Sequence, residues 1–374
     1  MTLKCNCCNR GGGKVDIFCK PVCALLMVFS SNNVVACASG SATRLEPRPE
    51  QSPDFGELLL RLRVVGLCGT DLYKLSAGNE QPGSVLGHEV VGEILSLGKG
   101  VQHFAVGDRI VVPHHVSCGD CSFCQKGNET MCEVFRENLI APGGFADTMV
   151  IGERAVTSAA YILSDEISDK AAVFLEPAAC VLRSIRRSGI GSGDLVVIQG
   201  AGPMGLLHLL VLRAEMPETR VIIIDPVSER RVFAEKLGAH EVLTPGKANL
   251  LAQNINADAV FDTVGGSVVM GSSIELTRHG GTVVLFAHAS NEEHAKIDLN
   301  SVFKFERRIV GTYSGALAEQ SAIFNLIKCG RLDPSLLVTH TMPLDDFEKG
   351  VSLVHNRKAL KVLFTPSKAS LGFL

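Results

Sequence analysis

Three residues that lie far apart in the chain carry side chains able to hold a catalytic metal ion. Cys68 offers a thiolate, His88 an imidazole and Glu176 a carboxylate. Three protein ligands of these types leave one position of a tetrahedron open, which is the arrangement of a catalytic zinc ion rather than a structural one. The three residues therefore predict a zinc site at which chemistry takes place.

A denser pattern of four thiols lies between them. Cys118, Cys121, Cys124 and Cys132 are separated by two, two and seven residues. Four thiolates can close a tetrahedron around zinc with no open position, which predicts a structural site. A ferredoxin-type iron–sulfur cluster needs three residues before its last cysteine and a proline after it, and Glu133 stands in that place. Free buried thiols are a third interpretation, which the density of the cluster disfavours.

A glycine-rich motif predicts a dinucleotide site in the second half of the chain. The motif consists of Gly200, Ala201, Gly202, Pro203, Met204 and Gly205. It follows the apolar run 195–199, which is typical of a buried strand, and precedes the helical stretch 206–214. In that context the glycines let the backbone approach a pyrophosphate at the N-terminus of the helix.

The choice between NAD and NADP depends on the next apolar run, 221–224, which ends on Asp225. A carboxylate at this place accepts hydrogen bonds from the ribose hydroxyls and repels a 2′-phosphate. Arg230 and Arg231 follow within one helical turn and are candidates for contact with the cofactor, including a 2′-phosphate. With Asp225 in place, the sequence predicts NAD.

Hydrophobic periodicity differs between the first and second parts of the chain. The run 57–66 is typical of a strand that delivers Cys68, and 85–97 and 109–112 are further strand candidates, so the first part is expected to be mainly β. From residue 193 apolar runs alternate with helical stretches, at 258–262, 282–286 and 309–312. This alternation predicts a doubly wound parallel sheet.

Size and composition favour a two-domain globular protein with a small-molecule partner. The 374 residues are enough for two domains, and 46% are hydrophobic. Lys and Arg number 36 against 39 Asp and Glu, with no basic stripe, so no nucleic-acid partner is expected. The apolar run 22–29 is too short to cross a bilayer, so no membrane association is expected either.

Cysteine usage bears on the compartment. Of 13 cysteines, four form the cluster described above and five fall within the first 23 residues, unlike a secreted disulfide framework. A reducing, cytoplasmic location is therefore predicted. Residues 1–32 are expected to form a disordered N-terminal extension that the fold does not need. A start codon placed too early is the favoured explanation for this segment, and a signal or transit segment and an additional metal-binding loop are the alternatives.

Taken in order, these motifs resemble the medium-chain, zinc-dependent alcohol dehydrogenase superfamily, from about residue 34 to residue 366. The segment from Gly87 to Val101 matches the signature of that family. The resemblance implies a GroES-like, mainly β catalytic domain over 33–185 and 316–374, with a structural zinc lobe, and a Rossmann domain over 186–315. It also implies a homodimer or homotetramer, with the apolar strand 309–312 as a candidate for pairing between subunits.

Glu176 points to one branch of this superfamily. Ordinary alcohol dehydrogenases have a cysteine as the third ligand, whereas Glu176 followed by Pro177 looks like the polyol branch typified by sorbitol dehydrogenase, to which threonine dehydrogenase is related. In that branch either Glu89 or Glu176 binds the metal, and both are predicted here. Cys180 is expected to be a buried thiol.

The resemblance also implies roles for the residues after Cys68. Thr70 matches the hydroxyl that passes the substrate proton outward, and Asp71 is expected to orient His88. The predicted activity is zinc-dependent transfer of a hydride from a secondary alcohol, polyol or sugar-like, to NAD.

The alternatives to this activity are a threonine 3-dehydrogenase-like or simple alcohol dehydrogenase, a zinc-free quinone or enoyl reductase, and a non-catalytic zinc or nucleotide-binding protein. Position suggests Tyr73, Phe135 and Arg136 as residues lining the substrate pocket. An anionic substrate would use Arg136.

Overall fold

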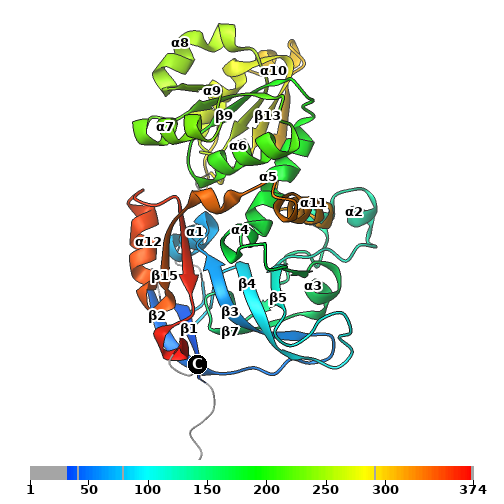
Figure 1. The fold of residues 1–374 in the computed structure, drawn as a ribbon. Helices are drawn as coiled ribbons and strands as arrows, with labels where there is room; N and C mark the ends of the chain where they lie inside the picture. The colour runs from blue at the N-terminus through cyan, green and yellow to red at the C-terminus, as the bar shows by residue number, and fades with distance from the viewer. Residues whose placement is uncertain (1–31, 40–41, 78–79, 290–291, 372–374) are drawn as a thin grey trace, which may run out of the picture.

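The computed structural model describes residues 32–39, 42–77, 80–289 and 292–371 (Figure 1). The extension predicted over residues 1–32 lies outside these ranges apart from Asn32, which begins the first strand. Within the described ranges, no helix has both the length and the apolar composition needed to cross a membrane.

The strands of the described chain form two sheets and a hairpin. They are β1 (Asn32–Ser39), β2 (Ala42–Pro49), β3 (Leu58–Gly66), β4 (Glu89–Leu97), β5 (Arg109–Pro113), β6 (Ile140–Ala141), β7 (Thr148–Ile151), β8 (Tyr161–Ile162), β9 (Leu195–Gln199), β10 (Arg220–Ile224), β11 (Glu241–Leu243), β12 (Ala257–Asp262), β13 (Thr277–Leu285), β14 (Arg308–Gly311), β15 (Val338–Pro343) and β16 (Lys361–Thr365).

The helices cover these sheets and join them. The α-helices are α1 (Gly69–Ala77), α2 (Ser122–Gln125), α3 (Glu153–Ser158), α4 (Asp169–Ala172), α5 (Leu175–Ser188), α6 (Pro203–Glu215), α7 (Ser228–Lys236), α8 (Pro245–Ile255), α9 (Ser267–Leu276), α10 (Leu299–Phe303), α11 (Leu317–Lys328), α12 (Phe347–His355) and α13 (Lys368–Leu371). The 3-10 helices are η1 (Glu129–Met131), η2 (Pro334–Leu337) and η3 (Leu344–Asp346).

The two sheets confirm the predicted fold class. The eight-stranded sheet runs β15-β16-β3-β4-β5-β8, with β7 between β3 and β6, and only its β15–β16 pair is parallel. The six-stranded sheet runs β11-β10-β9-β12-β13-β14, and all its pairs are parallel. In Figure 1 these sheets make the lower and the upper lobe, with helices on both faces of the upper one. This is a GroES-like β domain beside a doubly wound Rossmann sheet.

One strand begins later than the sequence indicates. The run 85–97 was expected to be extended throughout, but β4 starts at Glu89. Gly87 has a φ of +89°, and a Cβ there would lie 2.8 Å from the backbone nitrogen of Phe145. A left-handed residue cannot continue a strand, so the chain turns at Gly87 and the strand begins only after His88.

The elements of the Rossmann sheet lie close to their predicted positions. The strands expected at 195–199, 221–224 and 258–262 are found within one residue of those bounds. The helix expected from residue 206 begins at Pro203, because proline is well suited to the first helical position, where the backbone N–H has no partner within the helix. β13 begins five residues before the expected 282, since α9 leads directly into it.

Helix α5 connects the two lobes. It contacts β5 in one sheet and β13 in the other, and Figure 1 shows it with α11 at the junction. On α5, Arg183 is 6% exposed and lies 3.4 Å from Glu319 on α11 and 3.6 Å from Glu129 in η1. The helix that carries Glu176 is therefore fixed both to α11 and to the segment 118–132 that contains the four clustered cysteines, called the cysteine-rich lobe below. The domain boundary predicted at 185/186 falls inside this helix and stays a prediction.

Candidate active site

Three of the predicted metal ligands come together at the end of the lower lobe that faces the Rossmann sheet. One ligand atom each of Cys68, His88 and Glu89 lies within 4.8 Å of the others. Cys68 stands directly before α1, while His88 and Glu89 stand at the start of β4. β3 and β4 pair antiparallel, with Gly66 opposite Glu89, so the sheet itself brings the thiol and the imidazole together.

Asp71 fixes the two segments that carry these ligands. Its side chain is 1% exposed, and its Oδ2 accepts a hydrogen bond from the backbone N–H of Cys68 at 3.0 Å. Its Oδ1 accepts one from the N–H of Gly87 at 3.3 Å and lies 3.4 Å from Nδ1 of His88. With Nδ1 facing this carboxylate, Nε2 of His88 is the nitrogen left for a metal.

The charges of the site favour a cation. Burial alone would lower the pKa of His88, but the negative charges of Asp71 and Cys68 raise that pKa well above its usual value. A field that stabilises a protonated imidazole also attracts a metal ion in the same place. Burial likewise would raise the pKa of Asp71, and His88 holds it below its usual value.

Glu89 has a free buried oxygen that suits a metal ligand. Its carboxylate is 1% exposed and forms an ion pair through Oε2 with Lys361 on β16, itself 5% exposed. Among the described residues, Oε1 has no hydrogen-bond partner. A buried carboxylate oxygen without a partner is costly, and a zinc ion would satisfy it. Gly66 makes room for this carboxylate, because a Cβ there would lie less than 3.0 Å from Oε2.

Glu176 lies beside this group rather than within it. It is the second residue of α5 and is half-buried, and its Oε1 accepts a hydrogen bond from Sγ of Cys180 at 3.3 Å. Burial raises the pKa of Glu176, His88 lowers it and Glu89 raises it further. The structure therefore groups Glu89 with Cys68 and His88 and places Glu176 next to them, while the identity of the third ligand stays a prediction. Thr70 is half-buried in the first turn of α1.

Two histidines that the sequence analysis overlooked stand next to the metal ligands. The ring of His114 lies 4.6 Å from that of His88, and the ring of His115 lies 3.6 Å from that of His114. β5 pairs with β4 so that Pro113 faces Glu89, which brings the residues after β5 beside His88. In the sequence, the feature that could have identified them is the pair of adjacent histidines directly after the apolar run 109–112, which was predicted to be a strand.

Both of these imidazoles are uncharged at neutral pH and available for hydrogen bonds. Burial, and then the charge of His88, lowers the pKa of His114 well below its usual value and that of His115 to about 4. In the part of the chain that the structure describes, the Nδ1 atoms of both have no hydrogen-bond partner. A neutral imidazole offers one donor and one acceptor, which suits the hydroxyl groups of a substrate.

The predicted pocket residues differ in their surroundings. Tyr73 on α1 is stacked on His288 of the other lobe, with ring centroids 5.6 Å apart. The guanidinium of Arg136 lies over the ring of Tyr313, 5.1 Å from its centroid. Phe135 is 1% exposed and packs with the cysteine-rich lobe, and its ring lies 5.3 Å from that of His115.

The cysteine cluster has the dimensions of a zinc tetrahedron. The Sγ atom of Cys124 lies 3.9 Å from that of Cys118 and 3.5 Å from that of Cys121, and Sγ of Cys132 lies 3.5 Å from that of Cys118. Zinc–sulfur bonds of about 2.3 Å at tetrahedral angles put the sulfurs roughly 3.8 Å apart. The four thiols therefore fit one ion with no open position, as the spacing predicts.

The glycine-rich loop has no room for a side chain at Gly205 but has room for one at Gly202. Gly200 follows β9 with a φ of +97°, and a Cβ on Gly205 would lie 2.9 Å from the carbonyl carbon of Gly200. At Gly202, which caps α6, the nearest atom to an added Cβ is Nη1 of Arg230 at 4.0 Å. The N-terminus of α6 thus presents an open backbone with a guanidinium beside it, which suits a phosphate group.

Asp225 has a structural role in addition to the predicted one. It is 3% exposed, and its two oxygens accept hydrogen bonds from the N–H groups of Ala201 and Val227, each at 2.8 Å. These bonds hold the glycine-rich loop against the end of β10. Each carboxylate oxygen keeps a second lone pair for a ribose hydroxyl. Arg231 donates to the carbonyl oxygen of Asp225 at 2.7 Å, so Arg230 is the arginine nearer to the loop.

Known families match both halves of the chain. Residues 54–161 match the alcohol dehydrogenase GroES-like domain, and residues 203–329 match the zinc-binding dehydrogenase family. The erythritol/L-threitol dehydrogenase of Mycolicibacterium smegmatis is 30% identical over 359 residues, which cover 89% of this chain and 97% of that protein. The chain belongs to the medium-chain, zinc-dependent alcohol dehydrogenase superfamily.

Two further similarities agree with this family. The L-galactonate-5-dehydrogenase of Escherichia coli K12 is 28% identical over 352 residues, covering 90% of this dehydrogenase and all of that protein. A solved structure of a zinc-binding dehydrogenase from Sinorhizobium meliloti 1021, bound to NADP, is 25% identical with a TM-score of 0.81, covering 90% of this chain and 100% of that one.

Membership confirms the broad functional prediction. The dehydrogenase is an oxidoreductase of the zinc-containing alcohol and polyol type, which uses a nicotinamide cofactor. The prediction of a non-catalytic zinc or nucleotide-binding protein finds no support among these relatives.

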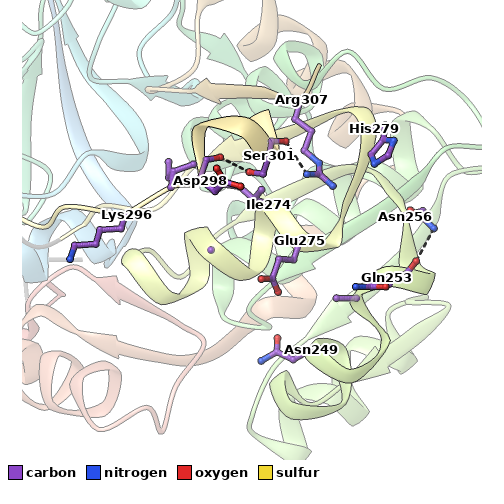
Figure 2. A pocket seen from close by; sticks show the side chains of 13 residues that line it. Asn249, Gln253, Asn256, Ile274, Glu275, His279, Lys296, Asp298, Ser301 and Arg307 are labelled. Atoms are coloured by element: carbon purple, nitrogen blue, oxygen red, sulfur yellow. Dashed lines mark hydrogen bonds between the residues drawn. The ribbon is translucent and has the colours of Figure 1, made fainter. Parts of the chain in front are cut away.

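A separate groove of about 660 Å³ lies at the other end of the Rossmann sheet (Figure 2). Asn256, His279 and Arg307 on its wall lie near the amino ends of β12, β13 and β14, whereas the glycine-rich loop follows the carboxyl end of β9. Figure 2 shows Arg307 beside Ser301, to whose carbonyl oxygen it donates at 3.0 Å. None of the predicted metal, cofactor or catalytic residues is among the described residues that line this groove.

Proposed function

We propose that this dehydrogenase oxidises a secondary alcohol group of a polyol-like substrate with NAD, at a zinc ion held by Cys68, His88 and Glu89. The observation that carries the proposal is the approach of these three ligand atoms to within 4.8 Å of one another. The unpartnered Oε1 of Glu89 adds support, because a metal ion would satisfy it. Glu176 remains the alternative third ligand.

Bound zinc supplies a Lewis acid that favours the alkoxide form of a substrate hydroxyl at neutral pH. Asp71 holds the imidazole of His88 in one orientation and tautomer through the contact at Nδ1. Thr70, in the first turn of α1, would take the proton of the substrate hydroxyl and pass it outward. Lys361 stays protonated, since the charges of Glu89 and Cys68 outweigh the effect of burial on its pKa.

NAD is the proposed cofactor, bound along the glycine-rich loop by Gly200, Gly202, Pro203, Met204 and Gly205. Asp225 would accept hydrogen bonds from the adenosine ribose, and Arg230 lies close enough to Gly202 to contact a phosphate. Since the relative from S. meliloti is bound to NADP, the choice between the two cofactors needs its own measurement. Titration of the apoenzyme with NADH and NADPH should give the tighter binding for NADH.

Polyols are the proposed substrate class because the related proteins act on erythritol, L-threitol and L-galactonate. His114 and His115 supply neutral donors and acceptors for the additional hydroxyls of such a chain. L-threonine and simple alcohols remain the alternative substrates, and an L-threonine 3-dehydrogenase from Coxiella burnetii is also 30% identical.

The assembly is proposed to be a homodimer or homotetramer in the cytoplasm. β14 is an edge strand of the Rossmann sheet, and Phe303 and Ile309 near it are 80% and 37% exposed. Exposed apolar groups beside an unpaired edge favour pairing with a second copy. All cysteines of the described part of the chain are free thiols, which agrees with a reducing compartment.

NAD reduction by the purified, zinc-loaded enzyme is the test of this function. The substrate panel should contain polyols, aldonates, simple secondary alcohols and L-threonine. Turnover should be lost in Cys68→Ala and retained in Cys329→Ala, which removes an exposed thiol at the end of α11. Equal activity of the Cys68→Ala variant, or a preference for L-threonine over every polyol, would contradict the proposal.

A further inference from the structure

An unneutralised arginine lies at the rim of the proposed active site. Arg136 is exposed, and no acidic side chain of the described residues lies within the 4.0 Å of an ion pair with its guanidinium. The neighbouring Glu137 pairs instead with Arg154 at 2.8 Å. The guanidinium lies flat over the ring of Tyr313, 5.1 Å from the centroid, which limits its motion without neutralising its charge.

Two lines of contact connect Arg136 with the metal ligands. On one side it follows Phe135, whose ring lies 5.3 Å from that of His115, and His115 and His114 lead to His88. Arg136 thus follows a residue whose ring begins a row of contacts to His88, and within that row His114 and His115 are the half-buried rings that a polyol chain could reach.

The second line of contact begins at Tyr313. The next residue, Ser314, contacts the thiol of Cys180, which donates to Glu176 at 3.3 Å. The segments that hold Phe135 and Tyr313 therefore both link Arg136 to the neighbourhood of the predicted metal ligands. A substrate that reached the metal could extend to this arginine.

A second cationic side chain, that of Lys74, stands near the two imidazoles. Lys74 on α1 acts on both His114 and His115, and it pairs with Glu80 only at 3.8 Å. The Nδ1 atoms of His114 and His115 have no hydrogen-bond partner among the described residues, so hydroxyl-binding groups lie near the proposed metal site and cationic groups lie farther out. This order of groups complements a chain of hydroxyls that ends in an anion.

This inference rests on the proposed function and deepens it. We propose that the preferred substrate is an acidic polyol, whose terminal oxyanion binds Arg136 while its hydroxyls lie along His115 and His114. A guanidinium fork matches the two oxygens of a carboxylate or phosphate in a way that a lysine cannot. Tyr313 positions the fork, and Lys74 adds a second charge.

The test compares substrates that differ only in the anionic group. The zinc-loaded enzyme is assayed with sorbitol, gluconate and sorbitol 6-phosphate, and kcat/KM is measured for each. At least one of the two anions should exceed the neutral polyol by about 10-fold or more, given the usual strength of a charge-assisted hydrogen bond. The two acids distinguish a carboxylate site from a phosphate site.

Arg136→Gln should lower kcat/KM for the preferred anion about 10- to 100-fold, mainly through KM, and change that for sorbitol by less than about 3-fold. Arg136→Lys should recover only part of the loss. Arg220→Gln, which removes an exposed arginine at the start of β10, serves as the matched control and should leave all three values unchanged. Calorimetry of gluconate or the phosphate on the NADH-bound enzyme should show the same weakening in Arg136→Gln.

The outcomes separate this inference from the proposed function. If sorbitol is turned over at least as well as both anions, or if Arg136→Gln affects neutral and anionic substrates equally, the acidic-substrate proposal is wrong while the dehydrogenase function stands. If the zinc-loaded enzyme oxidises no alcohol of the wider panel, the proposed function itself fails, and this inference fails with it.

Discussion

The two ends of the glycine-rich motif should respond differently to the same added methyl group. In Gly205→Ala the new Cβ would lie 2.9 Å from the carbonyl carbon of Gly200 and 3.1 Å from Oγ1 of Thr263, whereas ordinary contacts begin at 3.4 Å. Gly200 cannot move away freely, because its loop is fixed by β9 and by the hydrogen bond from Ala201 to Asp225. The start of α6 must therefore shift outward.

The cost of that shift can be stated for both folding and binding. Overpacking of this kind costs about 1–3 kcal/mol, and collision with backbone rather than a flexible side chain places Gly205→Ala in the upper part of that range. If the shift breaks one or two hydrogen bonds from the loop to charged phosphate oxygens, each worth about 1.5–3 kcal/mol, NADH binding should weaken on the order of 100-fold.

Gly202→Ala should weaken cofactor binding without destabilising the fold. The nearest atom to its added Cβ is 4.0 Å away and the backbone has a φ of −76°, so the free enzyme accommodates alanine with a change in stability within about 0.5 kcal/mol. The methyl group would stand where a pyrophosphate must approach, which should raise the Kd for NADH about 10- to 100-fold. Gly271→Ala on α9, with no atom within 4 Å, is the control.

Urea denaturation of the cofactor-free variants and NADH fluorescence titration would measure the two effects separately. Gly205→Ala should be less stable to urea and bind NADH more weakly. Gly202→Ala should bind NADH more weakly with unchanged stability, and Gly271→Ala should lose neither stability nor affinity. Wild-type stability of Gly205→Ala would refute the packing argument. Equal loss of stability in Gly202→Ala and Gly205→Ala would refute the assignment of separate roles.

Three other changes test the metal sites and a buried histidine. Asp71→Asn should weaken zinc binding about 10- to 100-fold in a chelator competition, because the carboxylate orients His88; unchanged affinity would contradict that role. Cys124→Ser should lose about one zinc ion per chain by elemental analysis while the other ion is retained, and loss of neither would argue against the tetrahedral site. Burial lowers the pKa of His208 from 6.5 to about 4, so the folded state favours its neutral form. Stability should be complete above pH 6.5 and fall as pH decreases towards 4, by about 3 kcal/mol from this group. His208→Leu should flatten that part of the pH profile, and an unchanged slope would assign it to other groups.

Local patterns in the sequence were enough to predict the parts of this protein whose geometry depends on neighbours along the chain. The four cysteines of the zinc lobe fall within fifteen residues, and their sulfurs meet because the intervening loop is short. The glycine-rich loop lies between a strand and a helix that were both visible as apolar runs, so its place at the carboxyl end of β9 followed directly. The start of β4, in contrast, was predicted wrongly at residue 85, because the apolar pattern of 85–97 does not reveal the left-handed backbone at Gly87.

The tertiary structure alone decided which side chains complete the proposed active site. Sequence reasoning began from Glu176 as the third ligand and added Glu89 from the family resemblance, whereas in the structure strand pairing brings Glu89 close to Cys68 and His88 and α5 places Glu176 beside them. His114 and His115 were missed because their approach to His88 depends on the register between β4 and β5, not on spacing. A motif records contacts between residues close in sequence. Register, burial and helix placement are set by the whole core, and they determine which distant groups share one site.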